Sequence, residues 1–194
     1  MNTSPQSGRT ARAVLLDDLS RPGARAALGR LLARSASADI AVDRVRLAAI
    51  DFRDRDLARL RQCRVVLGSL DVHALIDAAE AAARAPAIAA NVAVLRRFIA
   101  TGRLQLRSGG ASRWRPDFCV LRGDGLRPVA RAGAISLIGH LGIGAAADRG
   151  PNLTCVLAGN DATGRAAEAF DRLWSDGHDV LDVVAETLDR YASP

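Results

Sequence analysis

The amino-acid sequence predicts a single α/β domain, folded as an α/β/α sandwich around a mixed central sheet. The chain has 194 residues, the length of one ordinary domain, and its 49% hydrophobic and 25% charged residues are typical of a folded globular protein. Segments with strand periodicity alternate with segments of helical periodicity, which favours a sheet covered on both faces. A hairpin signal within 117–138 indicates a mixed sheet rather than a wholly parallel one.

The first half of the chain predicts a tail followed by strands and helices in alternation. Residues 1–12 are polar and are expected to form a loose tail before a domain at 13–194. Gly102 is placed to end the last helix of this half. The predicted elements are a short strand or lead-in at 13–16, a helix at 22–37, a strand at 39–50, a short helix at 54–61, a buried strand at 63–68 and helices at 71–84 and 86–100.

The second half predicts mostly strands and then two closing helices. A Gly-Asp-Gly turn at 123–125 follows an apolar run and is typical of a hairpin. The predicted elements are strands at 104–107, 117–121, 128–138 and 152–158, and helices at 161–176 and 178–191. The sequence contains no internal repeat, and no long linker or second domain is expected.

The chain contains no apolar run of the ~20 residues that a membrane-spanning helix needs. Its N-terminus lacks the apolar core of a signal peptide. We therefore expect a cytoplasmic protein without a membrane span.

All 27 basic residues are arginine, and the formal net charge is +6. A GC-rich genome would produce part of this bias. Arginine stays protonated and binds phosphates with a fork of donors, but it is a poor general base or Schiff-base nucleophile. Chemistry that needs an ammonium group is thus excluded, and polyanions are the first candidate partners.

The three cysteines, Cys63, Cys119 and Cys155, are widely spaced, and each lies inside an apolar run. Zinc sites need ligands at paired spacings, and disulfides need an even number of cysteines. We therefore expect buried free thiols, and no metal.

The order of elements resembles one repeat of the phospholipase D superfamily, which includes lipases, nucleases and nuclease-like domains beside helicases. The likeness spans residues 24–178 and includes Asn152-Leu153 on a late strand and Phe170, Leu173 and Trp174 on the closing helix. The resemblance implies a phospholipase D-like fold. It also implies a homodimer, because members with a single repeat commonly pair across a shared cleft.

The positions that would carry the family's chemistry are different here. Arg115-Pro116-Asp117 stands in place of the family's H-x-K, and Gly133 to Ser136 stands in place of G-S-x-N. Thr154 replaces the glutamate that follows Asn-Leu. The family uses an imidazole as the nucleophile and a lysine to hold the phosphate. Guanidinium has no free lone pair, and the carboxylate of Asp117 would repel phosphate, so we expect no catalytic residues.

His140 is the alternative nucleophile, in the glycine-rich segment 138–144, although a local packing role is the simpler interpretation. The same segment precedes no predicted helix and lacks a P-loop lysine, so we expect no nucleotide cofactor. His73 and His178 are expected to be structural.

Two groups of arginines stand out in the sequence. Arg103, Arg107, Arg113 and Arg115, with Trp114, would suit phosphate contact and base stacking, although a solvated loop has the same composition. The second group, within residues 53–64, is interleaved with aspartates, which is typical of ion pairs on a wet surface.

Together these observations lead to three hypotheses. The first is a degenerate phospholipase D-like domain that binds nucleic acid or assembles with a helicase or nuclease partner, in a DNA-processing or phage-defence system. The second is a divergent, metal-independent phosphodiesterase that uses His140, and the third is a purely structural scaffold. The sequence does not distinguish DNA from RNA as the ligand.

Overall fold

The structure is a computed structural model, and it describes residues 12–16, 22–43, 57–82, 84–109, 117–127, 133–139 and 154–191. Some of the predicted elements fall outside these ranges. They are the tail at 1–11, the parts of predicted strands at 44–50, 128–132 and 152–153, and the part of a predicted helix at 54–56. No helix in the described part is long and apolar enough to cross a membrane.

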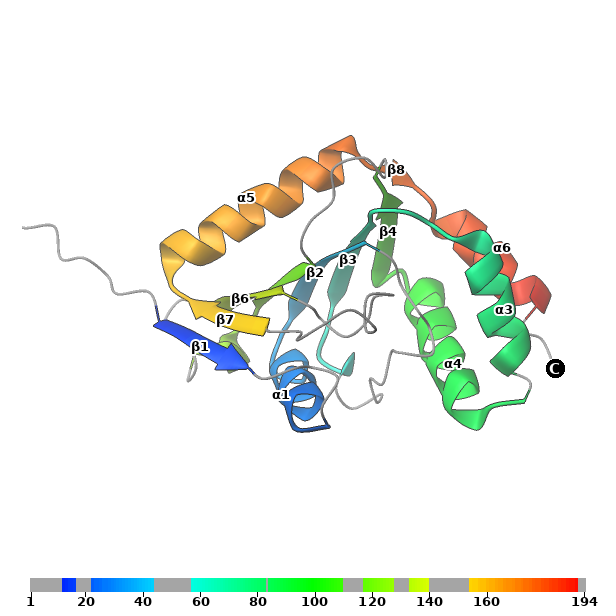
Figure 1. Cartoon of the computed structure of the whole chain (residues 1–194), viewed down its shortest axis with the longest axis horizontal. Coiled ribbons are helices and arrows are strands. Elements are labelled where there is room, and N and C mark those ends of the chain that lie inside the picture. The colour runs from blue at the N-terminus through cyan, green and yellow to red at the C-terminus, as the bar shows by residue number, and fades with distance from the viewer. Residues whose placement is uncertain are drawn as a thin grey trace, which may run out of the picture.

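A mixed sheet of eight strands forms the centre of the fold (Figure 1), in the order β1-β7-β6-β5-β2-β3-β4-β8. Only β2, β3 and β4 are parallel to one another, and every other pair is antiparallel. The strands are β1 (Arg12–Leu16), β2 (Ser37–Val42), β3 (Gln62–Leu67), β4 (Leu104–Ser108), β5 (Phe118–Arg122), β6 (Ala134–Gly139), β7 (Thr154–Ala158) and β8 (His178–Asp179).

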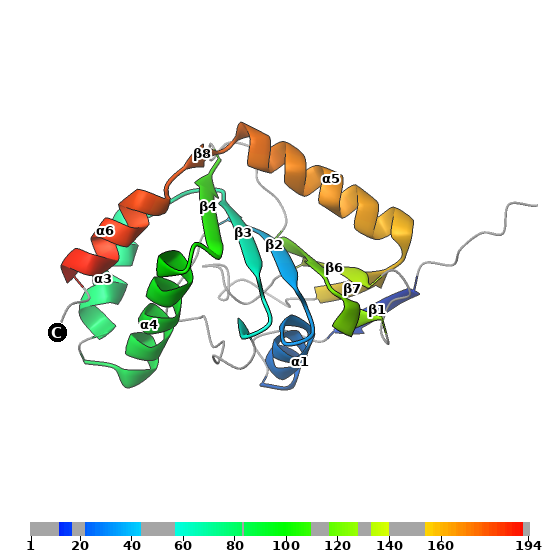
Figure 2. The ribbon, with the colours of Figure 1, turned by 180° about the vertical axis from the view of Figure 1, so that it is seen from behind.

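Helices cover both faces of the sheet, as the alternation of elements predicts. The helix α5 (Asn160–Asp176) crosses one face alone, whereas α3, α4 and α6 pack together near β4 (Figures 1 and 2). In the described part of the chain, α3 spans Val72–Ala82, α4 spans Pro86–Ala100 and α6 spans Leu181–Tyr191, and a further helix, α1, spans Pro22–Leu32.

The strand pleat divides the buried residues into two cores. Under α5, Ala41, Val66 and Val120 pack against Phe170. Residues at the alternate positions form the larger core under the other helices, with Leu32 of α1 and Leu188 of α6 buried in it. This separation follows from the two-residue period of a strand, which points neighbouring side chains to opposite faces.

Several predicted boundaries are corrected by the structure. The helix predicted at 22–37 ends at Leu32, because the chain must turn before Ser37 joins the sheet. The strand predicted at 39–50 starts earlier, at Ser37, which pairs with both Gln62 and Arg122, and it ends at Val42. The helix predicted from residue 178 begins at Leu181, because His178 and Asp179 pair with β4 as a short edge strand. The predicted short helix at 54–61 has ended by 58, where a turn begins.

The hairpin of β5 and β6 is confirmed, but its connection is longer than the tight turn that the sequence predicts. A short 3₁₀ turn, Asp124–Leu126, follows β5, and the amide of Gly123 donates to the carbonyl of Gly133 at 2.8 Å. A Cβ at Gly125 would lie 2.5 Å from the carbonyl oxygen of Arg34. The glycines of this connection therefore allow it to pack directly on the chain that leads into β2.

Candidate functional site

Asp117 lies immediately before β5, at the edge of the sheet where β2, β3 and β4 end. The backbone amide of Asp43, the residue after β2, donates to Oδ1 of Asp117 at 3.1 Å. The described residues thus place the carboxylate of Asp117 at this edge of the sheet. A second carboxylate, that of Asp43 itself, lies at the end of the neighbouring strand β2.

Ser136 is not close to Asp117. Its partner across the ladder is Val120, three residues along β5, which corresponds to about 10 Å of strand. The side chain is fully buried in the middle of β6, and its Oγ has no hydrogen-bond partner among the described residues. The structure therefore places Ser136 inside the sheet and not at the edge where Asp117 lies.

Arg103 and Arg107, two of the predicted phosphate contacts, lie at opposite ends of β4. Arg103 precedes the strand, stacks over the ring of Phe98 at 4.4 Å and donates from Nη1 to the carbonyl of Leu60 at 2.9 Å. Arg107 is turned to the α5 face, where it stacks over Trp174 at 4.8 Å and donates to the carbonyl of that residue at 2.6 Å. Each guanidinium is thus held by the fold, and the two do not form one site.

The other predicted site residues, Arg113, Trp114, Arg115 and His140, lie outside the described residues. The described residues stop at Gly109 and resume at Asp117, and both of these residues lie at the same edge of the sheet. Gly139 ends β6 one residue beyond Ile138, whose partner is Phe118, so the strand that leads to His140 also reaches this edge.

A buried charge network under α5 is the feature that the sequence analysis missed. Asp39 is 2% exposed, and its two oxygens accept from Nε and Nη2 of Arg64 at 2.7 and 2.9 Å. Arg122 donates to the same carboxylate from β5, and Arg64 also reaches Asp171 of α5 at 3.1 Å. Hydrogen bonding to Asp39 raises the pKa of Arg64, although partial burial acts against this.

Arg64 is therefore corrected from an ion pair on a wet surface to a half-buried member of this network. Its guanidinium also stacks over Phe170 at 4.8 Å and Trp174 at 5.4 Å. The sequence carried one signal for this network, because each of two apolar strands has a charged residue at a core-facing position. The structure makes these two residues, Asp39 and Arg64, direct partners in the ladder. Because Arg64 and Arg122 both donate hydrogen bonds to it, the carboxylate of Asp39 has its charge neutralised and is not available as a reactive group.

The described cysteines are free, and Cys63 and Cys119 are buried. Burial raises the pKa of the Cys63 thiol to about 12, with a smaller contribution from Asp39, and burial likewise raises the pKa of Cys119. Both thiols are therefore protonated at neutral pH and are poor nucleophiles. Within the described ranges, no group of three metal-ligating side chains comes together.

An apolar cavity of about 170 Å³ lies on the other side of the sheet, between the strands and the helices α3 and α4. Its lining is mainly hydrocarbon, with Ser69, Asp71 and Asn91 as polar exceptions. Such a lining offers no cation to hold a phosphate, so this cavity is not a phosphodiesterase site.

No protein-family model and no curated protein sequence matches the chain. Among solved structures, NucT from Helicobacter pylori superposes with a TM-score of 0.53 at 7% identity, covering 88% of this chain and 99% of that one. The phospholipase D family member Nuc from Salmonella typhimurium gives 0.49 at 12% identity, covering 88% and 97%. The likeness to NucT shows that the two proteins share an overall fold, and the predicted mixed sheet covered by helices is confirmed.

A third structure, TrmBL2, described as an archaeal chromatin protein with a novel mode of DNA binding, gives a TM-score of 0.49 at 10% identity. The match covers 91% of this chain but only 57% of TrmBL2, so this chain spans little more than half of that protein.

Proposed function

We propose that this chain is a phospholipase D-like domain that binds nucleic acid or assembles with a nucleic-acid enzyme, and that it does not itself hydrolyse phosphodiesters. The observation that carries the proposal is Asp117, a carboxylate held by the amide of Asp43 at the head of β5. This is the position at which the resemblance expects the lysine that holds the phosphate.

The physical argument concerns charge at the reacting phosphate. A phosphodiesterase of this type needs a nucleophile and a cation that stabilises the negative transition state. The chain has no lysine to supply that cation, and a carboxylate in its place would raise the barrier. The overall charge of +6, carried by arginine alone, nevertheless supports attraction to a polyanion.

The proposal is tested by binding and cleavage assays on the same protein. We expect labelled duplex and single-stranded DNA to bind at 50 mM salt, and affinity to fall by about 100-fold at 200 mM if about four phosphates are neutralised. No cleavage is expected with or without divalent metal. Absence of binding at both salt concentrations, or turnover of the DNA, would contradict the proposal.

The competing proposal, a metal-independent phosphodiesterase that uses His140, is supported by the course of β6. This strand reaches the edge that holds Asp117, and His140 follows its last residue, Gly139. Metal-independent cleavage that disappears in His140→Ala, with unchanged DNA binding, would establish this function instead.

The resemblance also supports a homodimer that acts beside a helicase or nuclease in a DNA-processing or phage-defence system. Light scattering at several concentrations tests the first part, and we expect the mass of two chains. A monomer throughout would contradict it.

A further inference from the structure

Exposed arginines gather at one edge of the sheet, where β2, β3 and β4 begin and β5 ends. Backbone hydrogen bonds hold these strand ends together. The amide of Ala36 donates to the carbonyl of Arg122 at 2.7 Å, and the amide of Arg61 donates to the carbonyl of Ala36 at 2.8 Å. The amide of Cys63 donates to Arg103 at 2.8 Å. We call this edge the basic edge. Its exposed arginines are Arg34, Arg59, Arg61 and Arg127, and Arg103 and Arg122 lie at the same strand ends with their guanidinium groups bound to the carbonyl of Leu60 and to Asp39.

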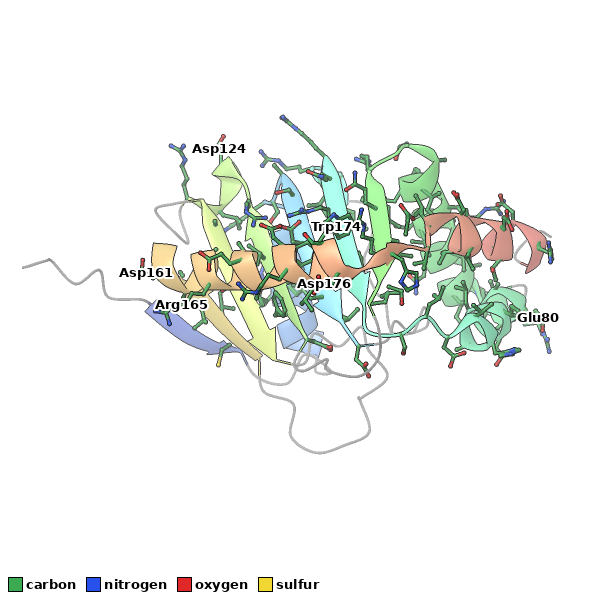
Figure 3. All side chains as sticks on the ribbon, turned by 90° about the horizontal axis from the view of Figure 1, so that it is seen from above. Glu80, Asp124, Asp161, Arg165, Trp174 and Asp176 are labelled. Carbon is green, nitrogen blue, oxygen red and sulfur yellow. The ribbon has the colours of Figure 1, made fainter. Side chains whose placement is uncertain are left out.

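The side chains at the basic edge are largely available to a partner. Arg34, Arg59 and Arg61 are exposed and pair with no residue that the structure describes. The side chain of Arg127 is 71% exposed and forms an ion pair with Asp124, which is itself 89% exposed. Such an exposed pair adds little to stability, so Arg127 can leave it to bind a partner. Figure 3 shows nitrogen-tipped side chains along the edge at which Asp124 is labelled.

The described loops of the basic edge carry little acidic charge. In the described loops of the basic edge, at 33–36, 57–61, 101–103 and 123–127, Asp124 is the sole acidic residue. Exposed cations with one acidic neighbour among the described loop residues attract a polyanion to the basic edge.

We propose that the basic edge is the surface that binds nucleic acid, and that it binds the phosphate backbone of a duplex. This inference rests on the proposed function and names its contact surface. Neighbouring strands are about 4.8 Å apart, so the four strand ends from β5 to β4 span roughly 14 Å. A duplex carries one charge per about 1.7 Å, so this length presents roughly eight phosphate charges to the four exposed arginines, Arg34, Arg59, Arg61 and Arg127.

The composition of the edge selects a duplex over other polyanions. Its described loops contain no aromatic residue, and the nearby Phe98 is covered by Arg103, so single-stranded bases find no stacking platform. A membrane surface is also disfavoured, because the sole large hydrophobic residue exposed in the described part is Val183, on α6. Guanidinium groups without apolar neighbours suit a phosphate backbone.

The test compares charge reversals of equal size at different places. Arg59→Glu/Arg61→Glu changes the basic edge, and the matched control Arg165→Glu/Arg172→Glu changes exposed arginines of α5. The affinity for a 5′-labelled duplex of about 20 base pairs is measured by anisotropy between 50 and 200 mM salt. We expect the edge variant to bind at least 10-fold more weakly than the control, with a log–log salt slope shallower by about 2.

A third variant, Arg113→Glu/Arg115→Glu, examines the segment that the sequence analysis singled out. If this variant loses binding and the basic-edge variant does not, the inference is overturned while the proposed function stands. Equal weakening by the edge variant and the α5 control also overturns it, because binding would then follow total charge. Failure of the wild type to bind either duplex or single-stranded DNA, or preference for anionic vesicles, defeats the proposed function as well, whereas binding of single strands alone overturns the inference only. Matching thermal unfolding curves exclude misfolding as the cause.

Discussion

At the scale of single residues, the buried carboxylate of Asp39 does most to organise the polar interior. It sits on β2 between Arg64 of β3 and Arg122 of β5, and both guanidinium groups donate to it. Burying one charge costs several kcal/mol unless partners surround it, so this carboxylate is stable only because the strand order brings cations from both sides. The network thereby ties the parallel and antiparallel halves of the sheet together.

Removing that charge should be costly. We expect Asp39→Asn to lower the free energy of unfolding by about 2–4 kcal/mol, because two half-buried guanidinium groups lose their anion. The control is Asp189→Asn, whose ion pair with Arg96 is exposed on both sides and should cost less than about 1 kcal/mol. Urea unfolding of both variants measures the difference, and equal effects would show that the buried network is unimportant.

At the scale of elements, α5 is fastened to the sheet by arginines that rise from two strands. Arg64 and Arg107 stack on Trp174, whose ring packs on Phe170 with centroids 5.8 Å apart. Arg107 also donates to the carbonyl of Trp174 near the end of the helix, where carbonyls lack partners within the helix. The helix is therefore positioned by cation–π contacts and a capping hydrogen bond as well as by its apolar face.

Two glycines in helices or at their ends should respond to alanine in opposite ways. Gly102 has φ of +64° just after α4, and nothing lies within 4 Å of an added Cβ, so Gly102→Ala costs about 1 kcal/mol through backbone strain alone. Gly164 lies within α5 and is equally unobstructed, so Gly164→Ala should stabilise by about 0.5–1 kcal/mol. Calorimetry measures the melting temperature of both variants. A shift of the same sign in both would contradict the different backbone conformations of Gly102 and Gly164.

At the scale of the whole molecule, the two thiols buried in the sheet make stability sensitive to alkali. The native pKa of Cys63 is raised to about 12 from an ordinary value of 9.0, and that of Cys119 is raised as well. Above about pH 9 the unfolded chain loses these protons while the native protein keeps them. Stability should therefore be complete below pH 9 and fall by up to about 1.4 kcal/mol per pH unit for each thiol.

Unfolding in urea between pH 8 and 11 measures this slope. We expect Cys63→Ala to be less stable at pH 8 but to lose stability less steeply as the pH rises, since one titrating group has been removed. A slope unchanged in both Cys63→Ala and Cys119→Ala would contradict burial of the thiols in the native sheet.

Much of the fold was predictable because its signals are local. The helix at 86–100, the strands around residues 65 and 120 and the helix stop at Gly102 each follow from the spacing of apolar residues or from one glycine. The predictions failed where a distant partner decided the outcome. His178 and Asp179 form a strand rather than a helical turn only because β4 offers them a free edge.

The sequence by itself determined the α/β class, the order of the elements and the restriction to arginine as the only basic side chain besides histidine. Tertiary structure alone decided which arginines neutralise Asp39, which fasten α5 and which remain exposed at the basic edge. The physical reason is range: periodicity acts between residues a few positions apart, whereas Arg64 meets Asp39 from 25 positions away and Asp171 from 107. Only the order of strands in the sheet brings such charges together or separates them.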